Sequence, residues 1–207
     1  MKYVVFDFNG TILDDVDVCL RALNQCIEHF GIKRNPLDRD EYLHVFDFPV
    51  KSYYEKVGFD WKGYSFEEVS AYWFDLYCSL KDEYKVHDGV IEILKKNREK
   101  GYQNIILSAS SLNEMKKQLR DLKIEEYFDE VLGIDNIYAA SKIDIGLEWM
   151  KDKNPLECIL IGDSLHDMEV ARKMNIDCIL VAKGHQAKDV LQNKYDKVVD
   201  DIRQVEL

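Results

Sequence analysis

Four short polar segments of the chain contain side chains that could do chemistry. Three of them directly follow short apolar runs: Asp7-Phe8-Asn9-Gly10-Thr11, Ser108-Ala109-Ser110-Ser111 and Gly162-Asp163-Ser164-Leu165-His166-Asp167. The fourth, Ser141-Lys142, precedes a helical pattern. A carboxylate can attack phosphorus or bind a hard cation, while hydroxyl, ammonium and main-chain N–H groups can hold phosphoryl oxygens. These residue types indicate chemistry on a phosphate group.

The apolar runs predict a parallel sheet that positions these segments. Six runs are expected to be strands: Tyr3–Phe6, Asn104–Leu107, Glu130–Leu132, Cys158–Ile161, Cys178–Val181 and Lys197–Val199. Four helices are expected between them: Val90–Lys100, Leu112–Leu122, Ile143–Lys151 and Asp167–Met174. Alternation of strand and helix indicates βαβ units, and such sheets bind phosphates where the carboxyl ends of strands meet helix N-termini. Ser111 and Glu114 are expected to form a capping box at one such terminus.

The alternation stops between residues 16 and 84, where helical patterns follow one another. The expected helices are Asp17–Phe30, Asp38–Phe46, Val50–Val57 and Phe66–Lys81. The prediction is therefore a Rossmann-like α/β core, residues 1–15 and 85–207, with helices flanking a parallel sheet and an inserted helical cap, residues 16–84. The cap contains many aromatic residues. They could form a substrate-binding wall, but filling the cap's own core is the simpler interpretation.

Charge and composition narrow the class of partner. The 207 residues contain 28 Lys and Arg against 39 Asp and Glu, a net charge of −11, which disfavours nucleic acid or an anionic membrane as the main partner. No apolar run approaches the ~18 residues of a membrane span, and the N-terminal run is too short for a signal peptide. The five cysteines form no C-x-x-C pair. We therefore expect a cytoplasmic protein that acts on a small phosphorylated metabolite. No sequence pattern indicates its oligomeric state.

The four segments, in this order and with this cap, resemble the haloacid dehalogenase superfamily, specifically its phosphoglycolate-phosphatase-like branch. The resemblance covers essentially the whole chain. It implies a Mg²⁺-dependent phosphatase that forms an aspartyl-phosphate on Asp7. It further implies that oxygen atoms of four residues hold the metal: Asp7, the main chain of Asn9, Asp163, and Asp167 through a water. The implied substrate contacts are Ser108, Ala109, Gly10 and Thr11, and Lys142 would neutralise both Asp7 and the phosphate.

Each of these residues also has a structural interpretation. Asp7 could make an Asx turn, Ser108 could cap a helix, and Asp163 and Asp167 could be acids at a helix N-terminus. Lys142 could lie on a solvated helix start, since the Lys-Pro more usual in the family is Lys-Ile here. His166 and His185 are expected to be packed or hydrogen-bonded loop residues.

Asn9 departs from the family pattern. The corresponding residue in its phosphatases is a second Asp, which protonates the leaving oxygen and then activates water. An amide has no such proton near pH 7, so the metal role survives through the main-chain carbonyl while the acid–base role is lost. Asp14 and a metal-bound water are the candidates to replace it.

The sequence is also compatible with two other functions. A 2-haloacid dehalogenase would not need an acid at position 9, but it would leave Asp163 and Asp167 without a purpose. A regulatory protein could bind phosphate with weak or no turnover.

Overall fold

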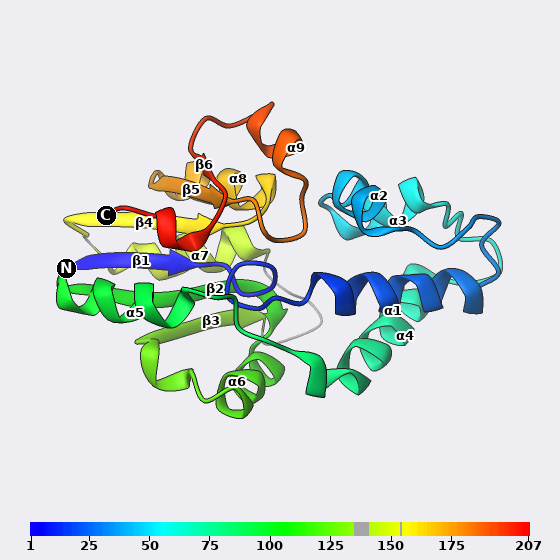
Figure 1. Cartoon of the computed structure of the whole chain (residues 1–207), viewed down its shortest axis with the longest axis horizontal. Coiled ribbons are helices and arrows are strands. Elements are labelled where there is room, and N and C mark those ends of the chain that lie inside the picture. Colours follow the sequence, from blue (N-terminus) through cyan, green and yellow to red (C-terminus); the bar gives the residue numbers. More distant parts are fainter. Residues whose placement is uncertain (135–140, 154) are drawn as a thin grey trace.

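The computed structural model describes residues 1–134, 141–153 and 155–207. Its centre is a six-stranded sheet of order β3-β2-β1-β4-β5-β6, and all five pairings are parallel (Figure 1). The strands are β1 (Lys2–Phe6), β2 (Tyr102–Ser111), β3 (Glu130–Ile134), β4 (Glu157–Gly162), β5 (Asp177–Val181) and β6 (Val198–Val199). The predicted Rossmann-like core is confirmed, with every expected strand present.

Helices cover both faces of the sheet, as its apolar strands require (Figure 1). Val4 and Phe6 of β1 share one apolar cluster with α5 (Val90–Glu99) and α6 (Leu112–Asp121). Tyr3 and Val5 share another with α7 (Lys142–Lys151), α8 (Leu165–Met174) and the short α9 (Lys188–Gln192), which the sequence patterns did not predict. Because successive strand residues point to opposite faces, β1 lies at the centre of both clusters and anchors the loop that follows it.

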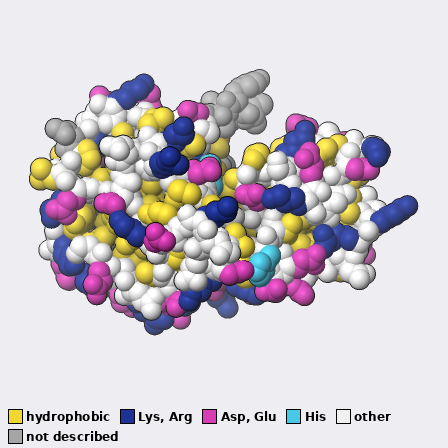
Figure 2. All heavy atoms as spheres, turned by 90° about the horizontal axis from the view of Figure 1, so that it is seen from above, with side chains coloured by type: hydrophobic (Ala, Val, Ile, Leu, Met, Phe, Trp, Pro, Cys, Tyr) yellow, Lys and Arg dark blue, Asp and Glu magenta, His cyan; other side chains and the backbone are white. Residues whose placement is uncertain are grey.

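A separate helical part is inserted between β1 and α5. It consists of α1 (Val16–His29), α2 (Arg39–Val45), α3 (Val50–Val57) and α4 (Phe66–Ser79), and it packs around its own apolar cluster. We call this insertion the cap. Figure 1 places the cap beyond the carboxyl end of β1, and Figure 2 shows a notch between cap and core. Charged side chains of both signs are interspersed on the face seen in Figure 2. None of the described helices has the length and apolar composition needed to cross a membrane.

One local prediction is wrong. Ser111 precedes α6, but its side chain accepts no hydrogen bond from the helix N-terminus. The reason is that β2 continues to Ser111, which pairs with Ile134 of β3. Capping boxes form instead at Ser65, before α4, and at Ser141, before α7.

Candidate active site

The strand order brings the predicted site segments together at one edge of the sheet. Asp7 directly follows β1 and Asp163 directly follows β4, the parallel neighbour of β1 on one side. Ser108 lies in β2, the neighbour on the other side. The main-chain N–H of Asp7 donates to the carbonyl of Ile161 at 2.9 Å, which ties the first loop to β4. Parallel pairing is thus what places residues about 150 positions apart in one site.

A buried ammonium group lies among the carboxylates. Lys142, at the start of α7, is 3% exposed, and its Nζ lies 2.5 Å from Asp7 Oδ1 and 2.5 Å from Asp167 Oδ1. Asp7, Asp163 and Asp167 each offer an oxygen, and these oxygens lie within 4.8 Å of one another. The interpretation of Lys142 as a solvated helix start is therefore wrong, because the side chain points into the core.

Negative charge exceeds positive charge in this cluster. Burial raises the pKa of Asp7 to about 8, Lys142 opposes this shift, and Asp167 and Asp163 add to it. Burial also raises the pKa of Asp163. Burial alone would lower the pKa of Lys142, but the charges of Asp167 and Asp7 outweigh it and the pKa is raised. Three carboxylates held close together with one ammonium form a site that gains stability from a further cation.

Two of the carboxylates are held by fixed donors. Asp163 Oδ1 accepts from the Thr11 hydroxyl at 3.0 Å, and its Oδ2 accepts from the main-chain N–H of His185 at 2.7 Å. Asp167 Oδ2 accepts from the Ser164 N–H at 3.0 Å and from its hydroxyl at 2.6 Å. Burial alone would raise the pKa of Asp167, yet Lys142 and Ser164 lower it, so this residue stays ionised. Through its bond to the Lys142 ammonium, Asp167 holds that group beside Asp7 and adds negative charge to the site.

The donor set fits Mg²⁺. This ion prefers oxygen ligands, mostly carboxylates and waters, and Asp7 and Asp163 supply two carboxylates beside the supporting Asp167. The raised pKa of Asp7 shows the same fit from the electrostatic side, since a cation would favour its charged form.

Gly10 and Thr11 contact the carboxylate framework. Gly10 has φ +73°, and a Cβ atom there would overlap the Asp163 carboxylate and the His185 ring, so glycine is required. The Gly10 N–H donates to Asp15 Oδ1 at 2.9 Å, and the Thr11 hydroxyl is directed to Asp163. Their predicted contact with substrate stays a prediction. Ser108 is buried, and it lines a cavity above Asp7 together with Ala109.

The amide of Asn9 is fully engaged in hydrogen bonds. Its Nδ2 donates to Asp15 Oδ2 at 2.7 Å and to the Tyr77 hydroxyl of the cap at 2.9 Å. Its Oδ1 accepts from the Ser110 hydroxyl at 2.7 Å. A carboxylate acceptor on one side and a hydroxyl donor on the other fix which end of the amide faces which partner.

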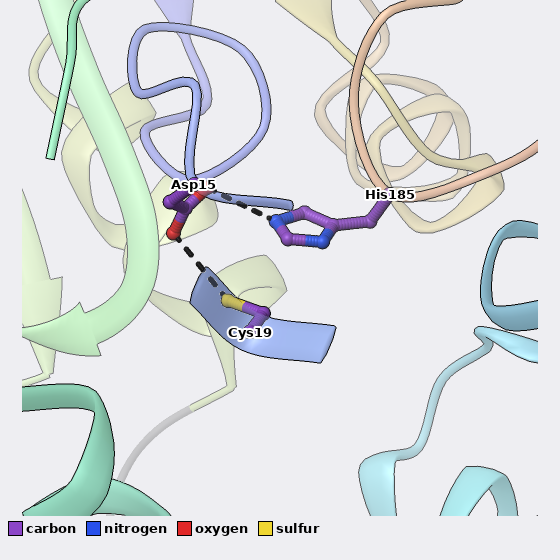
Figure 3. A group of neighbouring side chains, drawn as sticks. All are labelled: Asp15, Cys19 and His185. Atoms are coloured by element: carbon purple, nitrogen blue, oxygen red, sulfur yellow. Dashed lines mark hydrogen bonds and ion pairs between the residues drawn. The ribbon is translucent and has the colours of Figure 1, made fainter. Parts of the chain in front are cut away.

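Asp15 is the hub of a second polar cluster, shown in Figure 3. It is fully buried, and His185 Nε2 lies 3.2 Å from its Oδ1. The other ring nitrogen of His185 is 2.8 Å from the Tyr42 hydroxyl, and the Cys19 thiol donates to Asp15 at 3.6 Å. Burial alone would raise the pKa of Asp15, but the bonds from His185 and Asn9 lower it. Burial alone would lower the pKa of His185, but the pairing with Asp15 raises this pKa to about 8.

Asp15, Cys19 and His185 are residue types that can also bind a transition metal, but their hydrogen bonds explain why they lie together here. A cysteine must be ionised to the thiolate to bind a metal, and burial raises the pKa of the Cys19 thiol well above its ordinary value. Asp15 already has five donors: the Gly10 N–H, the Asn9 amide, the Tyr77 hydroxyl, the Cys19 thiol and His185.

The sequence patterns did not assign a role to Asp15, His185 or Tyr77. His185 is packed and hydrogen-bonded, as expected of a loop histidine. His166 instead lies in α8, where its ring stacks on Phe48 with centroids 4.5 Å apart. Asp14, the sequence candidate for a replacement acid, is exposed, whereas its neighbour Asp15 is buried beside Asn9. The Asp14-Asp15 pair at the start of the insertion was the only signal that could have pointed there.

The sequence model of the haloacid dehalogenase-like hydrolases matches residues 4–181. The chain belongs to this family. Phosphoglycolate phosphatase of Aliivibrio fischeri is 22% identical over 97% of this chain and 92% of its own length. The tyrosine-protein kinase PtkA of Mycobacterium tuberculosis is 24% identical over 96% of this chain and 68% of its own length.

Solved structures agree with this assignment. The crystal structure of a predicted phosphatase from Clostridium acetobutylicum superposes with a TM-score of 0.77 at 25% identity, covering 97% of this chain and 94% of that one. This hydrolase therefore shares the fold of the family over nearly all its length.

Proposed function

We propose that this hydrolase cleaves a small phosphomonoester with Mg²⁺ and forms a covalent phosphoryl intermediate on Asp7. The observation that supports this most strongly is the buried group of Asp7, Asp163 and Asp167 around Lys142. It combines a nucleophile, a cation site and a fixed positive charge at the edge of the sheet where phosphates bind.

The two half-reactions can be written for the residues present. In the first, an Asp7 oxygen bonds to phosphorus while the bond from phosphorus to the ester oxygen breaks, and the leaving group departs with the electron pair. In the second, water attacks phosphorus, the bond to Asp7 breaks and inorganic phosphate leaves. Lys142 holds Asp7 and would offset the negative charge that gathers on the phosphoryl oxygens, and Ser108 would donate to one of them. When bound, Mg²⁺ would screen the repulsion between Asp7 and the phosphate.

Asn9 limits the leaving groups that this site can release quickly. Its amide is locked between Asp15 and Ser110 and cannot give up or take a proton. General acid–base help contributes about 10²–10⁴-fold in typical enzymes. Alkyl phosphates, whose alkoxide needs a proton, should therefore react slowly, while aryl or acyl phosphates should react faster.

The other two functions are less well supported. Halide displacement by Asp7 would need no cation, and it would leave the charge excess of Asp163 and Asp167 unexplained. A phosphate-binding protein without turnover would use the same pocket, and only kinetics separates it from an enzyme.

The test is phosphate release from acetyl phosphate with Mg²⁺ and with excess EDTA. We expect turnover with Mg²⁺ only. Asp163→Asn should lower Mg²⁺ affinity by more than about tenfold, whereas the matched control Asp177→Asn, an exposed residue paired with Lys197, should not. Mg²⁺-dependent binding of phosphate without turnover would favour the binding protein. Halide release from a 2-haloacid in EDTA would favour the dehalogenase.

A further inference from the structure

The active-site residues open into a cavity of about 390 Å³ that lies between the core and the cap. Its floor is polar and contains the carboxylates, Lys142 and the serines that follow Leu107 in β2. Its roof comes from all four cap helices and the segment after α2, and most of its side chains are aromatic: Tyr42, Phe46, Phe48, Tyr53, Tyr54, Trp73, Phe74 and Tyr77. This volume lies at the small end of the range for small-molecule sites, enough for a phosphate and one ring.

The roof carries no compensating charge. Among the described residues that line the cavity, the two cationic side chains are already paired: Lys142 with Asp7 and Asp167, and His185 with Asp15. Glu114 adds a negative charge at the edge. A substrate with a second anionic group, such as a carboxylate or another phosphate, would have to lose its hydration there without a free cation to pair with, which is costly.

The aromatic rings of the lining pack against one another in pairs. The centroids of Trp73 and Tyr77 of α4 lie 5.1 Å apart, and those of Phe46 and Tyr53 lie 5.2 Å apart. Offset or edge contacts between aromatic rings add roughly 0.5–1.5 kcal/mol each to what burial provides. An aliphatic leaving group would gain only the burial contribution.

We propose that the substrate is a small aryl phosphate monoester whose ring bears no charge. This inference rests on the proposed function and specifies its substrate class. It agrees with the chemistry at Asn9, because the bond from phosphorus to a phenolic oxygen can break without a proton donor, the phenolate leaving with the electron pair and taking its proton from water. The cap wall thus favours the class of leaving group that the catalytic residues can release without a proton donor.

The test compares three substrates with Mg²⁺. Acetyl phosphate reports the reaction of the core alone, phenyl phosphate adds the ring, and 4-carboxyphenyl phosphate adds a charge to that ring. We expect kcat/KM for phenyl phosphate to exceed that for its carboxylated relative by about tenfold or more, equal to about 1.4 kcal/mol. We expect phenyl phosphate to react faster even though the carboxylated phenol is the slightly stronger acid and therefore the better leaving group.

Two matched variants locate the effect. Trp73→Leu should lower kcat/KM for phenyl phosphate by a larger factor than it does for acetyl phosphate. Trp61→Leu, a half-buried tryptophan of the cap outside the cavity lining, should leave both values as in the wild type. Phe74→Lys places an ammonium group at the cavity rim, and it should narrow the gap between the two aryl substrates.

A binding measurement separates the inference from the proposed function. Calorimetry with Mg²⁺ should show benzylphosphonate binding more tightly than methylphosphonate, and phosphonoacetate binding no better than methylphosphonate. Equal affinities, or a preference for the carboxylated ligands, would overturn the aryl assignment while acetyl phosphate turnover still upheld the phosphatase. Failure of acetyl phosphate turnover would instead overturn the proposed function.

Discussion

At the scale of single residues, Asn9 is explained by its neighbour Asp15. The Asp15 carboxylate is buried and accepts from the Asn9 amide at 2.7 Å. A carboxylate at position 9 would face the buried carboxylate of Asp15, and one of the two would have to be protonated. The chain therefore keeps an amide where relatives with a two-Asp motif have an acid.

The first prediction exchanges the two groups. Asn9→Asp alone should destabilise the fold by about 1–3 kcal/mol, because it removes a buried donor and adds a like charge. The double variant Asn9→Asp with Asp15→Asn restores the pair, since the new amide can donate to position 9 while its oxygen accepts from Gly10 and His185. Urea unfolding of the wild type, both single variants and the double variant gives the coupling energy.

We expect that coupling to be at least about 1 kcal/mol. The double variant should also hydrolyse alkyl phosphates faster than the wild type, relative to aryl phosphates, because it has regained a carboxyl group beside the leaving oxygen. Additive effects on stability, with no change in the ratio of alkyl to aryl rates, would show that Asp15 does not determine the residue at position 9.

The second prediction concerns the proton on Asp7. Since its pKa in the metal-free protein is about 8, Mg²⁺ must displace a proton below that pH. The apparent Mg²⁺ affinity should therefore rise by up to about tenfold per pH unit between pH 6 and 8 and level off above it. Calorimetry in two buffers of different ionisation enthalpy counts the proton released. An affinity independent of pH over this range, with no proton release, would mean that Asp7 is already ionised.

At the scale of elements, strand order determines which side chains meet, and local signals determine where the elements begin and end. The sequence predicted all six strands and the polar segments at the carboxyl ends of β1, β2 and β4, because each strand is a distinct apolar run. It misplaced the end of β2, where Ser108-Ala109-Ser110-Ser111 looks like a helix start but continues the strand. Pairing with β3 overrides the local capping signal there.

The third prediction uses this contrast. Ser65 accepts from the Glu68 N–H at 3.1 Å and caps α4, whereas Ser111 caps nothing. Ser65→Ala should lower the free energy of unfolding by about 1 kcal/mol, and Ser111→Ala should change it by less than about 0.5 kcal/mol. Thermal or urea unfolding of the two variants provides the comparison. Equal losses would mean that the Ser111 hydroxyl has a stabilising partner after all.

At the scale of the whole molecule, a few polar contacts join the cap to the core. Tyr77 of α4 donates to Asp15 at 2.9 Å, and Tyr42 of α2 contacts His185 at 2.8 Å. The main chain adds to this, with the Ala187 N–H donating to the carbonyl of Leu43 at 3.0 Å. No sequence pattern could have predicted these contacts, because they join single side chains separated by 62 to 143 positions and have no periodicity. They depend on how the two parts dock.

The fourth prediction is a pH dependence of stability. The pKa of His185 is about 8 in the folded protein against an ordinary value of 6.5, so the folded state binds the proton more tightly. The ion pair with Asp15 then stabilises the fold fully below about pH 6.5, and this contribution, about 1–2 kcal/mol, is lost as the pH rises through 8. Asp7 contributes a trend of the same sign in the metal-free protein.

Comparison with His185→Gln isolates the histidine. Urea unfolding in EDTA at pH 6, 7, 8 and 9 should show the difference in stability between wild type and variant shrinking with rising pH. A difference that stays constant across this range would mean that His185 is neutral in the folded protein.

The central claim is that Asp7 becomes phosphorylated. The measurement is acid quench during turnover of phenyl phosphate with Mg²⁺, followed by mass spectrometry of the peptide that contains Asp7. Because Asn9 provides no base for the second half-reaction, the phosphorylated protein should accumulate to a measurable fraction, carry its phosphoryl group on Asp7, and disappear in EDTA and in Asp7→Asn. Turnover of phenyl phosphate with no phosphoryl group on the protein, or with one on another residue, would contradict the account.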